Sequence, residues 1–479
     1  MKKAVLIILV LLPGLGLSAQ KSVNRILLPI SKDSTAAVVG YSLRDEERAR
    51  GMSEGDGLVE TFFDASSLVH LSEKDAVEGR ITYRNGKKRN VRWNTASDFG
   101  LLYPYVLADS LGGDLSGESY SFHGGYSRRV GDLFLGGRAS YRALHEYRDF
   151  DPRPRAITSD FSVDLSTGFL AGGNHLVDLT AGYRRYHQSL SVIFADMRGA
   201  NTAEFHMTGL GSHFSRFQSI GGYANTRYRG HGLTAAADFI PLNGSGLDAG
   251  VSYGFFSSVR HLVNQNEAPI TELATHTFEG RVFWLSSQHW GKWAAGADAS
   301  AELRRGDENI VSNLVTGNFE TLLKMRMYYR DEYSADIWAE LFYKAFHTRP
   351  SVGFTTFDAS HLYPARKISL RTVSAELPVE FSLPSKTLSV KISGSSGVDI
   401  SSDGTFMIPS EYTMERLLND MKSQFEVVSD TRIRLSGGFS LGKDIGKGFS
   451  LILGGRISRW IYAGGYGATL AELSCGISL

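Results

Sequence analysis

The sequence is poor in cysteine and proline, and it has no long apolar segment beyond its first residues. The single cysteine, Cys475, excludes an intramolecular disulfide and a cysteine-based metal site. After the N-terminal segment no window approaches ~18 apolar residues, which excludes crossing a membrane by helices. The formal net charge of +1 offers no basic excess for phosphate contacts, so nucleic acid is not an expected partner. With 12 prolines against 52 glycines, the composition suits long unbroken strands better than disorder.

The first residues have the features of an export signal. Lys2 and Lys3 precede an apolar run over residues 4–12, and Ala19 offers a small residue for cleavage. A charged start, a short apolar core and a small residue at the cut site are typical of a secretory signal peptide. The run is too short to span a membrane. We therefore expect residues 1–19 to be a signal peptide.

From about residue 119 to the end, apolar and polar residues alternate, which is the pattern of β-strands. A soluble β-sandwich alternates in the same way, so alternation alone does not identify the architecture. The runs are long, however: residues 293–304 and 337–345 belong to segments near the ~9–11 residues that a tilted strand needs to cross a bilayer. Aromatic residues such as Trp293 and Tyr343 lie near segment ends, as in the interfacial girdles of membrane barrels.

The joints between these segments alternate between short and long. Short, turn-like joints occur at 129–132, 171–174, 243–246, 331–334, 383–386 and 442–447, and longer polar joints at 146–156, 188–218, 263–272, 305–316, 347–365 and 402–424. Bacterial barrels have short periplasmic turns and long extracellular loops, whereas a sandwich has no reason to keep this alternation.

These patterns predict about 15 strands between residues 119 and 479, with 222–242 as one long strand and a turn at 229–232 as the alternative. Because a barrel with both ends in the periplasm needs an even number, one more strand is expected upstream, most simply at 101–109. We therefore predict an all-β fold: a transmembrane antiparallel β-barrel of about 16 strands, with 14 or 18 as alternatives. Its last strand is expected to end at Leu479.

The stretch from 20 to 96 differs from the rest of the chain. It is more charged, its alternation is weak, and Asn85-Gly86 is a hairpin signal. We expect a plug inside the lumen, a periplasmic cap or an extra hairpin of the barrel, and the sequence leaves these three open. The transmembrane barrel itself is expected over residues 97–479.

Several local motifs give the chain a family likeness. They are Tyr83–Lys88, Trp93-Asn94, Ser97-Asp98, Leu102–Tyr105, Gly112–Asp114, Gly124–Tyr126 and Asn201–Phe205. With these motifs, most of the mature chain resembles uncharacterised outer-membrane barrels of Bacteroides-type bacteria. The resemblance implies a barrel of unknown function, and it transfers no catalytic or binding residue.

If the apolar strand faces meet lipid, the opposite faces meet the lumen. The candidate lumen-lining residues on these faces are Arg138, Arg184, Asp248, Asp298, Lys324, Arg326, Glu340, Arg432, Arg434 and Arg456. Such charges either line an aqueous pore and set its selectivity, or pair into a network that fills a closed lumen. Arg432 and Arg434, one strand from Arg456, form a positive cluster that would favour anions, with neutral pairing as the alternative.

Residues 413–425 contain apolar residues at helical spacing, among them Met414, Leu417 and Met421. This spacing predicts a short amphipathic helix over the mouth of the barrel. An ordinary packed loop helix is the simpler interpretation, and a lid is the alternative.

Two loops hold groups of the types that catalysis uses. They are His145, Glu146, Asp149 and Asp151 in one loop, and Ser212, His213, Asp196 and Glu204 in the other. The first set resembles a site for activating water and the second a hydroxyl nucleophile with a base, but ordinary loop charges account for both. No GxSxG, HExxH or P-loop motif occurs, and the histidines show no paired helical spacing for a metal. We expect no enzyme activity and no cofactor or metal.

The sequence therefore favours an outer-membrane protein that acts as a channel or uptake porin for an unknown small solute. A surface-binding or secretion-accessory barrel with a filled lumen is the alternative, and a barrel enzyme at the outer rim comes third. The expected partners are outer-membrane lipid, the barrel assembly machinery and the small solute.

Overall fold

The computed structural model of the chain describes residues 33–193, 204–216, 225–312, 320–383, 388–446 and 448–479. The expected signal peptide, residues 1–19, lies outside these ranges and stays a prediction. None of the helices within them combines the length and the apolar composition that a membrane span requires.

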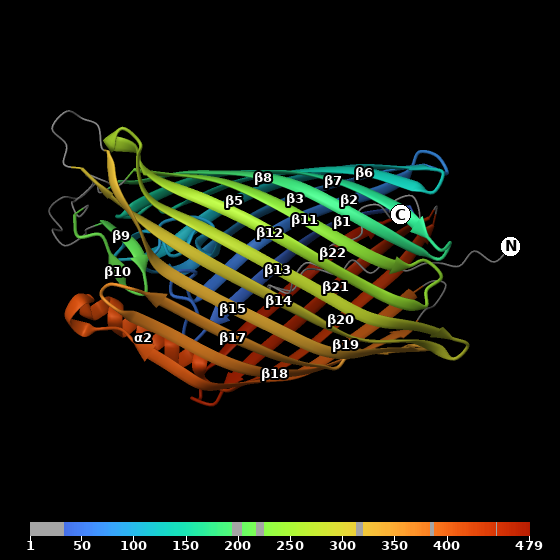
Figure 1. The fold of residues 1–479 in the computed structure, drawn as a ribbon. Coiled ribbons are helices and arrows are strands. Elements are labelled where there is room, and N and C mark those ends of the chain that lie inside the picture. Colours follow the sequence, from blue (N-terminus) through green and yellow to red (C-terminus); the bar gives the residue numbers. More distant parts are fainter. Residues whose placement is uncertain (1–32, 194–203, 217–224, 313–319, 384–387, 447) are drawn as a thin grey trace.

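The wall is one antiparallel sheet. Its strands are β1 (Ser34–Glu46), β2 (Gly57–His70), β3 (Asp75–Val91), β5 (Gly113–Val130), β6 (Leu133–Tyr147), β7 (Arg153–Ala171), β8 (His175–Ile193), β11 (Thr226–Pro241), β12 (Gly246–Leu262), β13 (Ala268–Gln288), β14 (Gly291–Val311), β15 (Thr321–Tyr343), β16 (Phe346–Thr348), β17 (Ser351–His361), β18 (Arg366–Leu383), β19 (Leu388–Met407), β20 (Arg432–Gly446), β21 (Phe449–Tyr462) and β22 (Gly467–Ser478). Strand β1 pairs with both β2 and β22, which closes the sheet into a barrel (Figure 1). Because β16 and β17 both lie between β15 and β18, the 19-stranded sheet forms a barrel of 18 wall strands in the described part of the chain.

The all-β antiparallel barrel is as predicted, but the count of about 16 strands is too low, and 18 is the alternative that the structure has. The difference lies upstream, where β1, β2 and β3 all belong to the wall. Residues 101–109, the expected extra strand, instead contain the end of helix α1 (Phe99–Leu102) and the short strand β4 (Leu107–Asp109), which is outside the wall. Polar residues on both faces of the outer end of β3, such as Lys87 and Lys88, explain why the alternation is weak there.

Large apolar side chains cover the outside of the barrel. Ile337 is 71 % exposed and Leu165 is 66 % exposed, whereas inward-facing Asp248 is 8 % exposed. A closed sheet leaves no unpaired edge in lipid, and antiparallel barrels with an apolar outer band are the architecture of outer-membrane proteins. The chain is therefore an outer-membrane β-barrel protein.

Short and long connections alternate along the chain, as predicted. Short turns, such as 131–132 and 172–174, lie at the end of the barrel that holds the C-terminus, and the long connections lie at the opposite end (Figure 1). By the rule for bacterial barrels, the opposite end is extracellular. Two predicted joints are wrong, because 331–334 lies inside β15 and 347–365 contains most of β16 and all of β17. A third, 442–447, is placed too early, because β20 runs to Gly446.

Neighbouring strands explain why the polar run 331–334 stays extended. Arg305 on β14 donates a hydrogen bond to Asp331, at 2.5 Å, and Ser334 bonds to the same strand. Opposite charges across a sheet stabilise polar residues that would otherwise favour a turn. Residues 229–232, the alternative turn, lie within β11 and pair in register with β8 and β12, so the prediction of one long strand is confirmed.

An inner layer covers the extracellular end of the barrel. It consists of the β3–β5 connection with α1 and β4, strands β9 (Glu204–Gly209) and β10 (Ser212–His213), and the β19–β20 connection with the 3-10 helix η4 (Ser410–Tyr412) and helix α2 (Glu415–Ser429) (Figure 1). Strands β4, β9 and β10 form their own three-stranded sheet. A second 3-10 helix, η3 (Val263–Gln265), follows β12. We call residues 92–112, 204–213 and 408–431 the cap.

Candidate functional site

The cap has an apolar centre that packs against the barrel wall. Trp93, Leu107 and Met207 of the cap share one buried cluster with Leu417 of α2 and Tyr228 of the wall. The helix predicted over 413–425 is confirmed as α2, and its buried residues include Leu417, Leu418 and Met421. It therefore belongs to a packed layer, as the simpler interpretation of its sequence states.

Polar residues fix the first cap segment locally. Asn94, Thr95 and Ser97 are almost completely buried. The Asn94 side chain accepts a hydrogen bond from the Ala96 N–H at 2.9 Å, and the Thr95 hydroxyl donates to the Leu107 carbonyl at 2.8 Å. Such side chains satisfy buried backbone groups that no sheet ladder satisfies. The segment consequently has a defined shape without regular secondary structure.

Arg142 on wall strand β6 binds this segment through the carboxylate of Asp98. Its guanidinium donates to both oxygens of Asp98, at 2.9 and 2.6 Å, and to Asp160 on β7 at 3.2 Å. Arg184 on β8 donates to the same Asp160, and Tyr186 donates to Asp98 at 3.0 Å. Bidentate arginine–carboxylate pairs fix orientation as well as charge. This network joins the cap to three consecutive wall strands.

Two further wall arginines bind the cap through its backbone. Arg304 on β14 donates to the carbonyl oxygens of Gly100, at 2.6 Å, and Tyr103, at 3.1 Å. Arg366 on β18 donates to the carbonyls of Leu210, at 3.0 Å, and Tyr412, at 2.7 Å. These arginines therefore supply the hydrogen bonds that the carbonyls lack inside the cap.

Arg260 on β12 lies at the centre of the contact between wall and cap. It is 1 % exposed and donates to the Val106 carbonyl at 3.3 Å and to Nδ1 of His206 at 2.7 Å. Burial, together with the charge of Arg260, holds the pKa of His206 well below its usual value. His206 is consequently neutral and accepts the hydrogen bond of a permanent cation.

Eight of the ten predicted lumen-lining residues alternate along their strands with exposed apolar side chains, whereas Lys324 and Arg326 alternate in phase with Leu322, which is 65 % exposed, beyond the register shift between β14 and β15. That these side chains line an open lumen stays a prediction. Most are paired with a charge on a neighbouring strand. The contacts are Arg138 with Glu78, Arg184 with Asp160, Asp248 with Arg281, Asp298 with Arg349 and Trp338, Lys324 and Arg326 with Asp307, Glu340 with His347, Arg432 with Asp399 and Arg434 with Glu376, while Arg456 stands opposite Glu472. The lumen face is thus a set of cross-strand ion pairs with both signs of charge.

The positive cluster expected around Arg432 and Arg434 is therefore largely neutralised, because each arginine has a carboxylate partner. The structure adds a residue that the sequence did not suggest: Arg50, in the β1–β2 connection, lies beside Arg432. Sequence reasoning also did not find Arg260 and Arg366 as cap-binding residues. The sequence indicated that Arg260 points inward from its strand and that Arg366 lies at the end of a strand. It did not indicate their cap partners, Val106 and Leu210, which lie 154 and 156 residues away in the chain.

The groups that resembled catalytic sets have structural contacts instead. His145 accepts a hydrogen bond from Arg155 and stacks on Tyr147, and Glu146 pairs with Lys88. Within the described ranges, no three or more His, Cys, Asp or Glu side chains are placed to hold a metal.

The second set lies in the cap. His213 packs edge-on against Phe205, and Ser212 and Glu204 are buried in the cap strands. Asp196, the fourth member of that set, lies outside the described residues.

The chain matches a family of unknown function (DUF6850) over residues 27–479. It belongs to that family. No curated protein matches this DUF6850 chain. The family agrees with the resemblance to uncharacterised barrels, while a Bacteroides-type source stays a prediction.

Solved structures show a distant likeness to this DUF6850 protein. A mutant of the ferric enterobactin receptor from Pseudomonas aeruginosa is 8 % identical, with a TM-score of 0.39, over 93 % of this chain and 80 % of that one. The unliganded ferric citrate transporter is 10 % identical, with a TM-score of 0.44, over 94 % and 79 %. An outer-membrane transporter from Escherichia coli is 7 % identical, with a TM-score of 0.41, over 94 % and 81 %. At these identities no function transfers from those proteins.

Proposed function

We propose that this chain is a gated outer-membrane channel for a small solute, with the cap as its gate. The single observation that carries the proposal is that the cap lies at the extracellular end without sharing a strand ladder with the wall in the described part of the chain. The cap can therefore rearrange while the hydrogen bonds of the closed barrel stay intact. A lumen with charges of both signs beneath it is suited to an aqueous path.

The strength of the wall–cap contacts fits a gate. Arg304 and Arg366 reach the cap by hydrogen bonds to carbonyls, and Arg142 reaches it by one carboxylate. Hydrogen bonds of charged groups contribute about 1.5–3 kcal/mol each, so these contacts, together with the apolar cluster, hold the cap in place unless a solute competes for them. Solute binding has to supply only part of that free energy to open the gate.

A second candidate is a barrel with a filled lumen that binds a ligand at the cell surface. The pairing of most of the predicted lumen charges favours it, because an ion-pair network can fill a lumen as well as line a pore. In this case the cap is a permanent part of the ligand-binding surface. The barrel assembly machinery stays an expected partner for either candidate.

Single-channel recording in a planar bilayer separates the two candidates. We expect rare openings for the native protein and frequent openings for Arg304→Gln, which removes the two cap contacts made by the guanidinium. Arg80→Gln is the matched control, since Arg80 faces the lumen but is held by Asp64 of a neighbouring strand. Silence of the native protein and of Arg304→Gln, in preparations that are folded, would favour the filled barrel.

A further inference from the structure

Three hydrogen-bond donors converge at the mouth of the lumen beside helix α2. Arg50 lies in the β1–β2 connection, Arg432 is the first residue of β20, and Tyr462 is the last residue of β21. Arg432 and Tyr462 are direct cross-strand partners. Val427 of α2 packs in the same buried cluster as Tyr462, so the helix covers this position.

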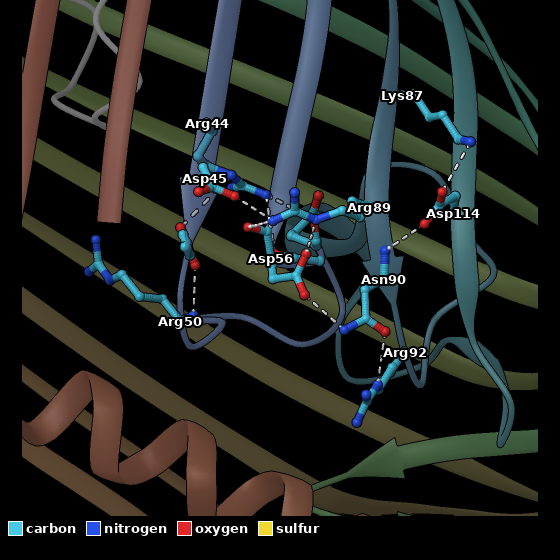
Figure 2. Close-up of polar contacts among 12 residues, drawn as sticks. Arg44, Asp45, Arg50, Asp56, Lys87, Arg89, Asn90, Arg92 and Asp114 are labelled. Carbon is cyan, nitrogen blue, oxygen red and sulfur yellow. Dashed lines mark hydrogen bonds and ion pairs between the residues drawn. The ribbon is translucent and has the colours of Figure 1, made fainter. Parts of the chain in front are cut away.

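Two of these groups have buried donors that the described part of the chain does not use. The Nε of Arg50 is buried and has no hydrogen-bond partner there, while the buried hydroxyl of Tyr462 accepts from Arg432 and has no acceptor for its own proton. Figure 2 shows the Arg50 guanidinium extending away from the neighbouring polar network, with no contact drawn to its head group. In the same view Arg44, Arg89 and Arg92 all donate to that network. Buried donors without a partner are costly, so they mark a place that a ligand can satisfy.

The carboxylates beside these donors are already engaged. Glu46 accepts the backbone N–H of Arg50 at 2.9 Å, and Asp399 accepts the Nε of Arg432 at 2.6 Å. Burial and the repulsion from Arg432 lower the pKa of Arg50 from its usual value. The charges of Arg50 and Arg432 are therefore balanced by those of Glu46 and Asp399. What distinguishes the position is that Arg50 keeps a buried donor that no described group uses.

We propose that Arg50, Arg432 and Tyr462 form a binding site for the oxyanion of a solute, a carboxylate or a phosphate, at the mouth of the lumen beneath α2. Planar guanidinium groups donate paired hydrogen bonds to such oxygens, and the phenol hydroxyl adds a third direction of donation. A cationic solute without an acceptor oxygen gains no hydrogen bond from these donors. This site depends on the proposed channel only for where the solute goes after it has bound. The site identifies anions as the class of solute.

Calorimetric titration of the full-length barrel in detergent tests this site. Inorganic phosphate and succinate are titrated separately at low chloride, so that the two arms distinguish a phosphate from a carboxylate ligand. We expect saturable binding of at least one of them, at least tenfold weaker in Arg50→Gln and weaker by a smaller factor in Tyr462→Phe. Tyr462→Phe keeps the packing against Val427 and removes only the hydroxyl, so it separates a ligand contact from a fold defect.

Arg80→Gln is again the matched control, because it removes one guanidinium from the same lumen at a place where Asp64 already engages it. Binding unchanged in Arg80→Gln supports the site, whereas an equal loss in Arg80→Gln overturns it in favour of non-specific attraction. Absence of saturable binding of both anions to the native protein also overturns it. Binding by a protein that never conducts would reject the gate and leave the site in place, so the two proposals fail separately.

Discussion

Arg260 of the wall and His206 of the cap are both almost fully buried, and the arginine donates its hydrogen bond to the imidazole at 2.7 Å. Since arginine stays charged at any pH that the cell meets, this contact requires a neutral His206. A proton on His206 would place two cations against each other where little water screens them. The closed cap is therefore sensitive to acid.

The first prediction is that acid opens the cap. The pKa of His206 in the closed cap is lowered by burial and then by Arg260, so the open state binds more protons below the usual value of 6.5. The stability that the neutral histidine gives the closed state is complete above pH 6.5 and is lost as the pH falls below it. His213, whose pKa is lowered by burial and by Arg366, acts in the same direction. Channel openings should rise by up to about tenfold per pH unit for each proton taken up.

The variant His206→Gln checks this assignment. Its amide oxygen can still accept from Arg260, but it does not titrate, so the steepness of the pH dependence should fall. Recording open probability from pH 7.5 to pH 5 measures the effect. A pH dependence that is as steep in His206→Gln as in the native protein would assign the response to other groups.

The second prediction concerns Asp98, which accepts hydrogen bonds from Arg142 and Tyr186. Asp98→Ala removes the carboxylate by which Arg142 holds the cap, while Arg142 keeps its contact with Asp160. We expect the opening free energy of the cap segment to fall by about 2–3 kcal/mol, as for loss of charged hydrogen bonds. Hydrogen exchange of residues 93–103 in native conditions measures this change.

The matched control is Asp64→Ala, which removes the partner of the exposed guanidinium of Arg80 within the wall. Pairs of this exposed kind contribute about 0–1 kcal/mol, and this one does not touch the cap. Exchange of residues 93–103 should not change in the control. A fall that is the same in both variants would mean that the cap responds to barrel stability in general.

The outer surface of the barrel was predictable from the sequence, because contact with lipid requires an apolar residue at every second position of each strand. In β12, the apolar residues Leu247, Val251 and Tyr253 alternate with inward-facing Asp248, and this period of two is visible without any partner. The alternation of short and long connections is equally local. The joint predicted at 331–334 failed because a charge partner on the neighbouring strand keeps that run extended.

The cap was not predictable, because its stability comes from contacts between distant residues. Asn94 and Thr95 look like a solvated loop in sequence, yet they are buried because the backbone of the cap satisfies their side chains. The same holds for Arg260, whose partner His206 is 54 residues away. A sequence shows which residues of a strand point inward. The group that pairs with an inward charge depends on how the strands are aligned with one another in the folded barrel.

The third prediction concerns barrel closure at the seam between β1 and β22. Gly476 on β22 faces Val38 on β1, and a Cβ atom at Gly476 would lie 2.5 Å from the carbonyl oxygen of Ala37. Because that oxygen belongs to the backbone, Gly476→Ala forces the two strands apart. We expect a loss of about 1–3 kcal/mol, the usual result of overpacking, and slower closure in refolding into lipid vesicles.

A glycine with free space provides the control. A Cβ atom at Gly437 on β20 would meet nothing within 4 Å, so Gly437→Ala adds a methyl group without a clash. The folded fraction in vesicles, read from gel mobility before and after heating, should fall for the seam variant and stay for this one. Equal folded fractions of the two variants would show that the barrel still closes when β1 and β22 are pushed apart.

The last prediction concerns the attachment of α2 to the cap. Asp420 on α2 accepts a hydrogen bond from the Trp93 indole N–H at 2.8 Å and pairs with Arg92 at 3.3 Å. Asp420→Ala leaves the buried indole N–H without its partner, which costs about 1–3 kcal/mol. The helix should therefore exchange its amide hydrogens faster over residues 415–429, although Leu417 and Met421 still pack in the core cluster.

Trp93 makes this effect specific, because it loses a polar partner while its ring stays among apolar neighbours. Lys422→Ala, at an exposed position of the same helix, is the control that changes charge without touching Trp93. Faster exchange in α2 for Asp420→Ala alone means that this one carboxylate joins the helix to the first cap segment. If both variants exchange alike, the apolar cluster holds α2 without help from Asp420, and α2 can then move only by breaking that cluster.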